Sequence, residues 1–219
     1  MTRTPAVNRD SLSQDQKAAY DAFVEQRGEV PTTGPASVML NAPEVAQRGL
    51  ELARFLRTDI SLSPRIRELA MLFTARARDC LFIWNAHVPA GRAAGLSDAL
   101  IDNLRDNLAL TGLAVDEAAV VNYGRELLDS NRVTQATFDA ALAQFGTRGL
   151  VELNSLIGCY TMLALNLNAF DVQLTRRSHG KAAASRAAAL NLSLVETGGR
   201  TAQQLTFQEP RWTQTGSIA

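Results

Sequence analysis

Apolar side chains recur along most of the chain at the spacing expected for α-helices. The clearest case follows Ser63 and Pro64, where four apolar residues at i, i+3, i+4 and i+7 share one helix face: Ile66, Leu69, Ala70 and Phe73. Serine as the capping residue and proline at the first helical position strengthen this helix start. The period-two alternation of strands is hardly visible anywhere. The pattern predicts an all-α fold, a single domain of about seven or eight helices joined by short loops.

Capping residues, glycines and prolines indicate where the individual helices begin and end. The predicted helices run from Ser11 or Ser13 to about Gln26, from Pro43 toward Arg57, from Ser63 to a break near Asp79, from Cys80 to about Ala94, from Ser97 through Leu104, from Val115 to Leu128, from Thr134 to Phe145, and from Thr147 to about Leu174. The stretch from Gly28 to Asn41 holds Pro31, Gly34 and Pro35, and we expect it to be an irregular connection.

The character of the chain changes after residue 178. From His179 onward the sequence is first alanine-rich and then polar, with Leu205, Phe207 and Trp212 as scattered apolar anchors. We therefore expect a helical domain over residues 1–178 and a C-terminal tail over residues 179–219. The tail is either disordered or an arm that lies on a neighbouring subunit.

Composition narrows the classes of function. The 219 residues carry 22 basic and 22 acidic side chains, and a net charge of zero argues against a broad nucleic-acid surface and a polybasic membrane anchor. The N-terminus does not resemble a signal peptide, and no uninterrupted run of 18 apolar residues occurs. Two cysteines are too few for a disulfide framework, and two histidines exclude a three-histidine metal site within one chain. We expect a cytoplasmic protein with no nucleic-acid or membrane partner and no metal.

One segment, residues 64–96, concentrates the candidate chemistry. Four residues of its second predicted helix share a face at 100° per residue: Cys80, Ile83, Trp84 and His87. His87 lies seven residues, or about 10.5 Å of helical rise, beyond Cys80, so these two cannot form a direct thiolate–imidazolium pair. Glu68, on the preceding helix, can project into the same space and orient His87 or a water.

This arrangement resembles the carboxymuconolactone decarboxylase family, which includes the alkylhydroperoxidase D-like proteins. The family pattern is Arg-x-Arg-Glu-Leu at a helix start, a cysteine or other small residue about a dozen positions later, then Trp-(Asn/Ala)-x-His and a run ending in Ala-Gly-Leu-Ser. The matching positions are Arg65, Arg67, Glu68, Leu69, Cys80, Trp84, Asn85, His87 and 94–97. A later stretch, from Leu150 to Val172 with Glu152, Gly158, Tyr160 and Asn168, resembles the family's C-terminal helix. The resemblance covers roughly residues 40–175.

The resemblance implies two possible chemistries, and the sequence departs from one of them. Peroxidase members carry Cys-x-x-Cys, whereas here Cys80 is followed by Ile83 in place of the second cysteine. A sulfenic acid formed on Cys80 would have no resolving thiol one turn away. Decarboxylase-type members need no metal or organic cofactor and act on an unsaturated lactone acid, which makes a cofactor-independent lyase the favoured interpretation.

The resemblance also implies roles for individual residues. His87 would be the general acid/base and Glu68 its partner, and the pocket would be lined by Cys80, Ile83, Trp84 and Asn85. Arg65 and Arg67 are the candidates for binding an acidic small-molecule substrate. Family members assemble as trimers or hexamers, so a homo-oligomer is expected.

Two other functions stay open at this stage. One is a thiol-dependent peroxidase that uses Cys80 with an external reductant, and the other is a non-catalytic binding or scaffold protein. The residues also have structural interpretations: His87 as a half-buried core histidine, and Glu68 as a surface residue paired with Arg65 or Arg67.

Overall fold

The computed structural model describes residue 3 and residues 7–172, and within them all regular secondary structure is helical. The elements are a 3-10 turn, η1 (Arg9–Ser11), followed by α1 (Gln14–Arg27), α2 (Gly34–Met39), α3 (Pro43–Thr58), α4 (Pro64–Ala77), α5 (Leu81–Ala93), α6 (Asp98–Arg105), α7 (Val115–Ser130) and α8 (Gln135–Ala169). The all-α prediction is confirmed. The expected boundary at 178/179 and the tail lie outside the described residues.

The predicted capping residues begin four of these helices. The side chains of Ser13, Ser63, Ser97 and Thr134 each accept a hydrogen bond from the backbone amide three residues later. Ser13, not Ser11, caps α1, and Gln16 returns a hydrogen bond to the Ser13 amide. Cys80 is the residue before α5 and not its first helical residue.

The prediction of an irregular connection from Gly28 to Asn41 is wrong for its second half, which forms α2. Pro35 is the second residue of this short helix, and proline fits the first helical turn. Val38, Met39 and Leu40 are buried against the rest of the domain. Tertiary burial therefore stabilises a helix that is too short and too rich in breakers to show in the sequence pattern.

The last predicted helices also differ in detail from the structure. The predicted stop at Gly146 appears as a break within α8, where this glycine has φ 64° and ψ 175°. The second part of α8 ends at Ala169 and not near Leu174, because Phe170 caps it and Asp171 turns to positive φ. Leu174 itself lies outside the described residues.

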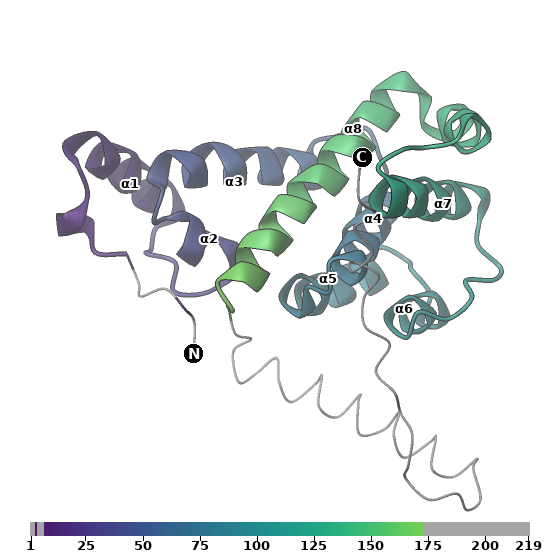
Figure 1. Cartoon of the computed structure of the whole chain (residues 1–219), viewed down its shortest axis with the longest axis horizontal. Coiled ribbons are helices and arrows are strands. Elements are labelled where there is room, and N and C mark those ends of the chain that lie inside the picture. Colours follow the sequence, from purple (N-terminus) through teal and green to yellow (C-terminus); the bar gives the residue numbers. More distant parts are fainter. Residues whose placement is uncertain (1–2, 4–6, 173–219) are drawn as a thin grey trace, which may run out of the picture. The chain divides into compact units, whose positions relative to one another are not determined.

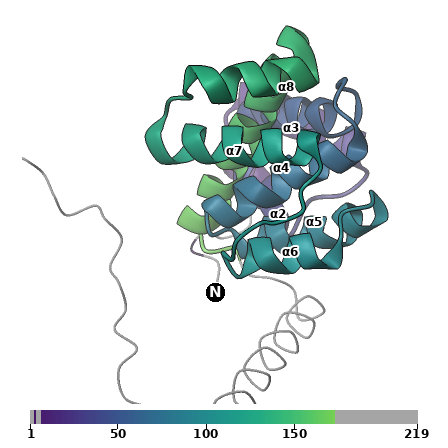
Figure 2. The same ribbon diagram turned by 90° about the vertical axis from the view of Figure 1, so that its right-hand side faces the viewer.

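Helices α4 and α8 form the centre of the described domain. In Figure 1, α8 runs diagonally across it, with α1–α3 on one side and α4–α7 on the other. Helix α4 packs against α5, α7 and α8, and its residues Leu69, Met71 and Leu72 are fully buried. Figure 2, turned by 90°, shows α7 in front of α4. Helices α5 and α6 lie toward the lower edge of this view and the first part of α8 lies at the top. The residues of α4 and α8 are thus held within the core.

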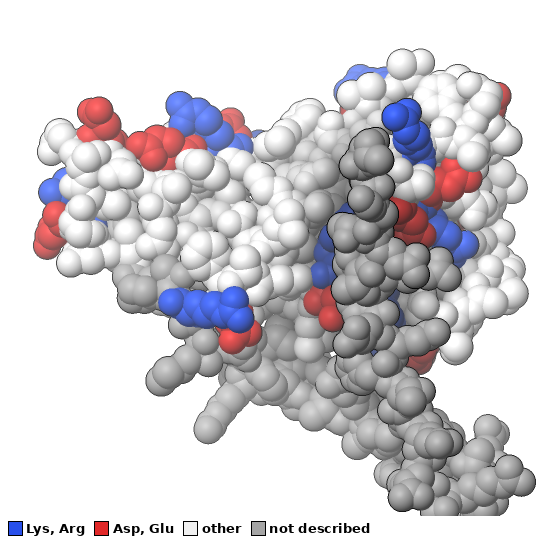
Figure 3. Space-filling view, viewed as in Figure 1, with Lys and Arg blue, Asp and Glu red and all other residues white. Residues whose placement is uncertain are grey.

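The length and composition of α8 would also allow it to cross a membrane, with a mean hydropathy of 1.3 over its most apolar window. However, 56% of that window is buried within the domain, as in the core helix of a globular protein. On the face shown in Figure 3, the described basic and acidic side chains lie intermixed rather than forming one extended basic region.

Candidate active site

A hydrogen bond between Glu68 and His87 joins the two helices of the 64–96 segment. Glu68 lies in the second turn of α4 and His87 in the middle of α5, and Oε2 of Glu68 is 2.9 Å from Nδ1 of His87. Both side chains are largely enclosed, with exposed fractions of 13% and 12%. The structure therefore brings together the two residues that the sequence pattern paired.

Gly91, one turn after His87, allows the close approach of α5 to α4. A Cβ atom at this position would lie 3.0 Å from Cδ1 of Leu72, 3.1 Å from Cδ1 of Leu96 and 3.9 Å from Cβ of Glu68. Because Leu72 is fully buried, there is little room for an added methyl group. The missing side chain lets the α5 backbone lie directly against the helix that carries Glu68.

Tyr160, from the second part of α8, extends the pair to a chain of three side chains. Its hydroxyl oxygen is 3.2 Å from Nε2 of His87. The two rings meet edge to face, with centroids 5.2 Å apart and an angle of 76° between their planes. Burial raises the pKa of Tyr160 well above its usual range, and the charge of Arg57 on α3 only partly opposes this. The phenol is therefore protonated at neutral pH.

In the chain Glu68–His87–Tyr160, both ring nitrogens of His87 keep a hydrogen bond in two protonation states. A carboxylate can only accept a hydrogen bond, so Nδ1 of His87 carries the hydrogen that is donated to Glu68. When His87 is neutral, the Tyr160 hydroxyl donates to Nε2. When His87 is protonated, Nε2–H donates to the Tyr160 oxygen, and the phenol hydrogen can be donated elsewhere. His87 can thus gain or lose a proton while both of its ring nitrogens stay hydrogen-bonded.

Cys80, Ile83 and Trp84 are buried together in the apolar core at the start of α5. Burial raises the pKa of the Cys80 thiol, and this outweighs the lowering by the backbone amides of Ile83 and Phe82. Cys80 is therefore a protonated thiol at neutral pH, and its neighbour at position 83 offers no second thiol.

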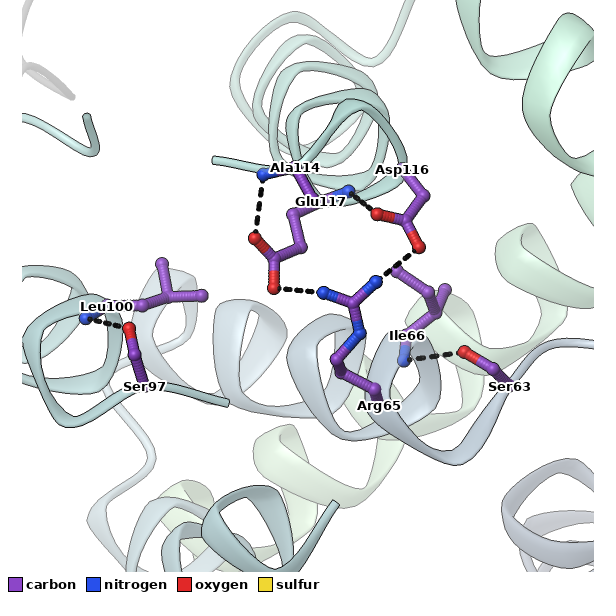
Figure 4. Close-up of polar contacts among 8 residues, drawn as sticks. All are labelled: Ser63, Arg65, Ile66, Ser97, Leu100, Ala114, Asp116 and Glu117. Carbon is purple, nitrogen blue, oxygen red and sulfur yellow. Dashed lines mark hydrogen bonds and ion pairs between the residues drawn. The ribbon is translucent and has the colours of Figure 1, made fainter. Parts of the chain in front are cut away.

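Arg65 points away from His87 and toward α7. Its guanidinium donates to Asp116 and Glu117, at 2.6 Å in each case, as Figure 4 shows. Glu117 in turn accepts a hydrogen bond from the amide of Ala114, so the cluster ties the start of α4 to the start of α7. The substrate-binding role of Arg65 stays a prediction, and its side chain is already engaged in this ion-pair cluster.

Arg67 and Asn85 are likewise engaged elsewhere. Arg67 donates to the carbonyl oxygens of Thr58 and Ile60, between α3 and α4, at 2.9 and 3.5 Å. The Asn85 amide donates to the carbonyl of Leu81, one turn earlier in its own helix, at 3.0 Å. Their predicted substrate contacts are untested, and the structure shows neither beside His87.

Two residues of this region were not among the sequence candidates, namely Tyr160, which contacts His87, and Arg57, whose charge acts on Tyr160. In the sequence, Tyr160 belongs to the stretch that resembles the family's C-terminal helix, with no role of its own. Its one distinguishing signal is a polar hydroxyl within an otherwise apolar stretch, because a buried tyrosine usually has a hydrogen-bond partner. Arg57 is one of many arginines in the sequence, and nothing local sets it apart.

No group of three or more His, Cys, Asp and Glu side chains that could hold a metal ion occurs among the described residues. Two surface hollows lie elsewhere. One, of about 390 Å³, lies between α7 and the first part of α8 and includes Val115 and Ala140. The other, of about 340 Å³, lies on α3 and includes Leu52 and Phe55. Neither contains a residue of the Glu68–His87–Tyr160 chain.

The sequence profile of the carboxymuconolactone decarboxylase family matches residues 43–126. This range starts with α3 and ends within α7, so it includes both Glu68 and His87. The chain contains a domain of the carboxymuconolactone decarboxylase family. Tyr160 lies outside the matched range. No curated protein matches the sequence.

Solved structures with an AhpD-like fold resemble this family domain. An uncharacterized peroxidase-related protein from Silicibacter sp. TM1040 has a TM-score of 0.63 at 17% identity, over 82% of this chain and 94% of its own. An AhpD-core protein from Ralstonia eutropha JMP134 has a TM-score of 0.62 at 16% identity, over 81% of this chain and 94% of its own. The debrominase Bmp8 has a TM-score of 0.56 at 12% identity, over 80% of this chain and 93% of its own. At these identities the likeness shows the fold, and it confirms the predicted AhpD-like architecture.

Proposed function

We propose that this protein is a cofactor-independent lyase that decarboxylates a small, acidic, unsaturated lactone or a related carboxylic acid. The observation that carries the proposal is the enclosed chain Glu68–His87–Tyr160, which supplies an imidazole that can exchange a proton while remaining hydrogen-bonded. The family match over residues 43–126 supports it, because this range includes both Glu68 and His87.

The proposed reaction needs only a proton donor from the protein. As the bond to the carboxylate carbon breaks, CO2 leaves and the bonding electron pair moves into the conjugated carbonyl of the substrate. A carbon of the resulting dienolate then takes a proton from His87, directly or through the Tyr160 hydroxyl. Glu68 holds the imidazole in one tautomer and stabilises its charged form, and solvent returns the proton.

The class of substrate, the compartment and the assembly of the protein are proposed from the family resemblance. The substrate is a small acidic molecule, and the protein is a cytoplasmic homo-oligomer, a trimer or hexamer as in the family. Exposed apolar side chains on α3 and α8 are available for such contacts, among them Leu52, Phe55, Val151 and Leu165.

The proposal is tested by screening lactone and muconate-type acids for CO2 release and for a change in ultraviolet absorbance. The wild-type protein should release one CO2 per molecule of product, and His87→Ala should lower kcat about 100-fold or more. If no acid releases CO2, the lyase proposal fails. If an acid binds without turnover and His87→Ala does not change its binding, the protein is a binding module instead.

The Tyr160 hydroxyl is tested separately. We expect Tyr160→Phe to lower kcat about 10- to 100-fold, because it removes the hydrogen bond to Nε2 of His87 while keeping the ring. Tyr123→Phe, at a buried tyrosine of α7, is the matched control and should leave kcat unchanged. Equal losses in the two variants would show that the hydroxyl contributes only to stability.

A further inference from the structure

Arg57 lies at the rim of the buried face of α3, next to the Glu68–His87–Tyr160 chain. It follows Ala53 by one turn and Leu56 by one residue, and both of these are buried. The side chain therefore starts at the edge of the core, while the residue as a whole is exposed. A guanidinium at this position can reach both the interior and the solvent.

Two contacts place α3, and the turn that follows it, against the part of α8 that holds Tyr160. Near the middle of α3, a Cβ atom on Gly49 would lie 3.4 Å from Cε of Met162. Past the end of α3, the Ser61 amide donates to Glu152 at 2.8 Å. The two segments thus run antiparallel, and Arg57 falls between these contacts, opposite the 152–162 stretch.

The guanidinium of Arg57 acts on the Tyr160 hydroxyl both as a charge and as a hydrogen-bonding group, and in both ways it opposes the rise in the pKa of the phenol. This agrees with the placement of the two helices. The positive charge of Arg57 therefore lies at the Tyr160 end of the three hydrogen-bonded side chains, and Glu68 is at the other end.

The arginines around Arg57 are engaged with other groups, whereas Arg57 has no carboxylate partner among residues 3 and 7–172. Arg54 pairs with Asp59, Arg65 with α7, and Arg148 with Glu152. An arginine beside a buried phenol and free of a carboxylate partner is suited to an anionic ligand, because guanidinium matches a carboxylate with two parallel hydrogen bonds.

We propose that Arg57 and Tyr160 form a binding site for a carboxylate group of the substrate, next to His87. This deepens the proposed function and rests on it for the identity of the reaction. When His87 is protonated and donates to the Tyr160 oxygen, the phenol hydrogen is free to be donated to the bound carboxylate. The acid is then held by Arg57 and Tyr160 together, next to the imidazole that donates the proton.

The test measures binding separately from turnover. The probes are cis,cis-muconate, a dicarboxylate, and its neutral dimethyl ester, and their dissociation constants are measured by calorimetry on the full-length protein. We expect Arg57→Gln to weaken muconate binding about 10- to 100-fold and to leave ester binding unchanged. Arg57→Lys should lie in between, since it keeps the charge but not the paired hydrogen bonds.

Arg54→Gln, one turn earlier on the same helix, is the matched control and should bind both probes like the wild type. Thermal unfolding of each variant checks that it is folded, and an exposed position such as Arg57 should show no loss. The proposal is overturned if the wild type does not bind muconate, or if Arg57→Gln binds it equally well. If muconate binding depends on Arg57 but no acid releases CO2, the carboxylate site stands and the lyase function fails.

Discussion

The thiol of Cys80 lies in surroundings opposite to those of a reactive cysteine. Reactive thiols are partly exposed and have a lowered pKa, whereas Cys80 is 1% exposed and burial raises its pKa. We therefore expect the folded protein to react slowly with a thiol-specific reagent such as Ellman's reagent at pH 7. Cys159 is also buried with a raised pKa, so both thiols should be protected until the protein unfolds.

Labelling in denaturant provides the control and should give two thiols per chain. Cys80→Ser should leave CO2 release within a few-fold of the wild type, since this thiol takes no part in the proposed proton transfer. Rapid oxidation of Cys80 by peroxide in the folded protein, lost in Cys80→Ser, would instead favour the peroxidase alternative.

The pairing of Glu68 with His87 could be predicted from the sequence because it is local. The two residues are 19 positions apart on consecutive helices, and helix geometry alone brings their faces together. Tyr160 is 73 positions from His87, and its approach depends on how α8 crosses α4 and α5. The position of Arg57 relative to Tyr160 depends in the same way on the packing of α3 against α8. No local spacing encodes such crossings.

At the level of helices, a similar division applies. Helix starts marked by a capping serine or threonine were predictable, because the cap is a local interaction between a side chain and an amide. The short α2 was not, because its stability comes from burial of Val38 and Leu40. Arg65 illustrates the same point. Its position in the motif can be recognised in the sequence, but its partners Asp116 and Glu117 lie on a helix that comes much later in the sequence.

The contact between α4 and α5 gives a prediction for Gly91→Ala. The added methyl group would meet the buried Leu72 at 3.0 Å and Leu96 at 3.1 Å, so these side chains or the α5 backbone must shift. We expect a loss of about 1 kcal/mol or more in the free energy of unfolding, despite alanine's higher helix propensity. Because His87 is one turn away, kcat should fall as well, and denaturant titration and kinetics measure the two effects.

Gly158→Ala on α8 is the matched control for this prediction. This glycine is exposed, and an added Cβ atom would meet nothing within 4 Å. Here helix propensity acts alone and should stabilise the protein by roughly 0.5–1 kcal/mol. An equal gain in stability at Gly91 would show that the α4–α5 contact is not tight.

Glu152 links α8 to the connection between α3 and α4 and should make this contact sensitive to pH. Burial tends to raise the pKa of Glu152, but hydrogen bonds from Ser61 and Arg148 outweigh it, so the pKa lies below its ordinary value of 4.5. A lowered pKa in the folded state means that the ionised carboxylate contributes stability above pH 4.5. This contribution is lost as the pH falls through the folded-state pKa.

We therefore expect Glu152→Gln to cost about 1 kcal/mol at pH 7, a modest value because Arg148 is exposed and its ion pair is screened. The difference from the wild type should shrink as the pH is lowered below 4. Denaturant unfolding at several pH values measures it, with Glu51→Gln on the exposed face of α3 as control. A difference that does not change with pH would show that the Glu152 charge is unimportant.

For the molecule as a whole, the described hydrophobic core lies within the predicted domain of residues 1–178. Its last fully packed residues are Leu163, Ala164 and Leu167 on α8, and Val172 packs partly against it. We therefore expect a chain that ends at residue 178 to unfold within about 2 °C of the full-length protein, a difference below 1 kcal/mol. A chain that ends at residue 162 removes Leu163 and Leu167 from the core and should be strongly destabilised.

The same truncated chain distinguishes the two predictions for residues 179–219. If these residues form an arm on a neighbouring subunit, removing them lowers the molar mass in light scattering, because the contact that the arm supplies is lost. If they make no such contact, the mass per assembly falls only by that of the missing residues, and a trimer or hexamer persists through the exposed apolar side chains of α3 and α8. Leu52→Asp should then separate the subunits, since a carboxylate buried in an apolar contact is strongly unfavourable.

A chain truncated at residue 178 that fails to fold would instead move the domain boundary beyond residue 178.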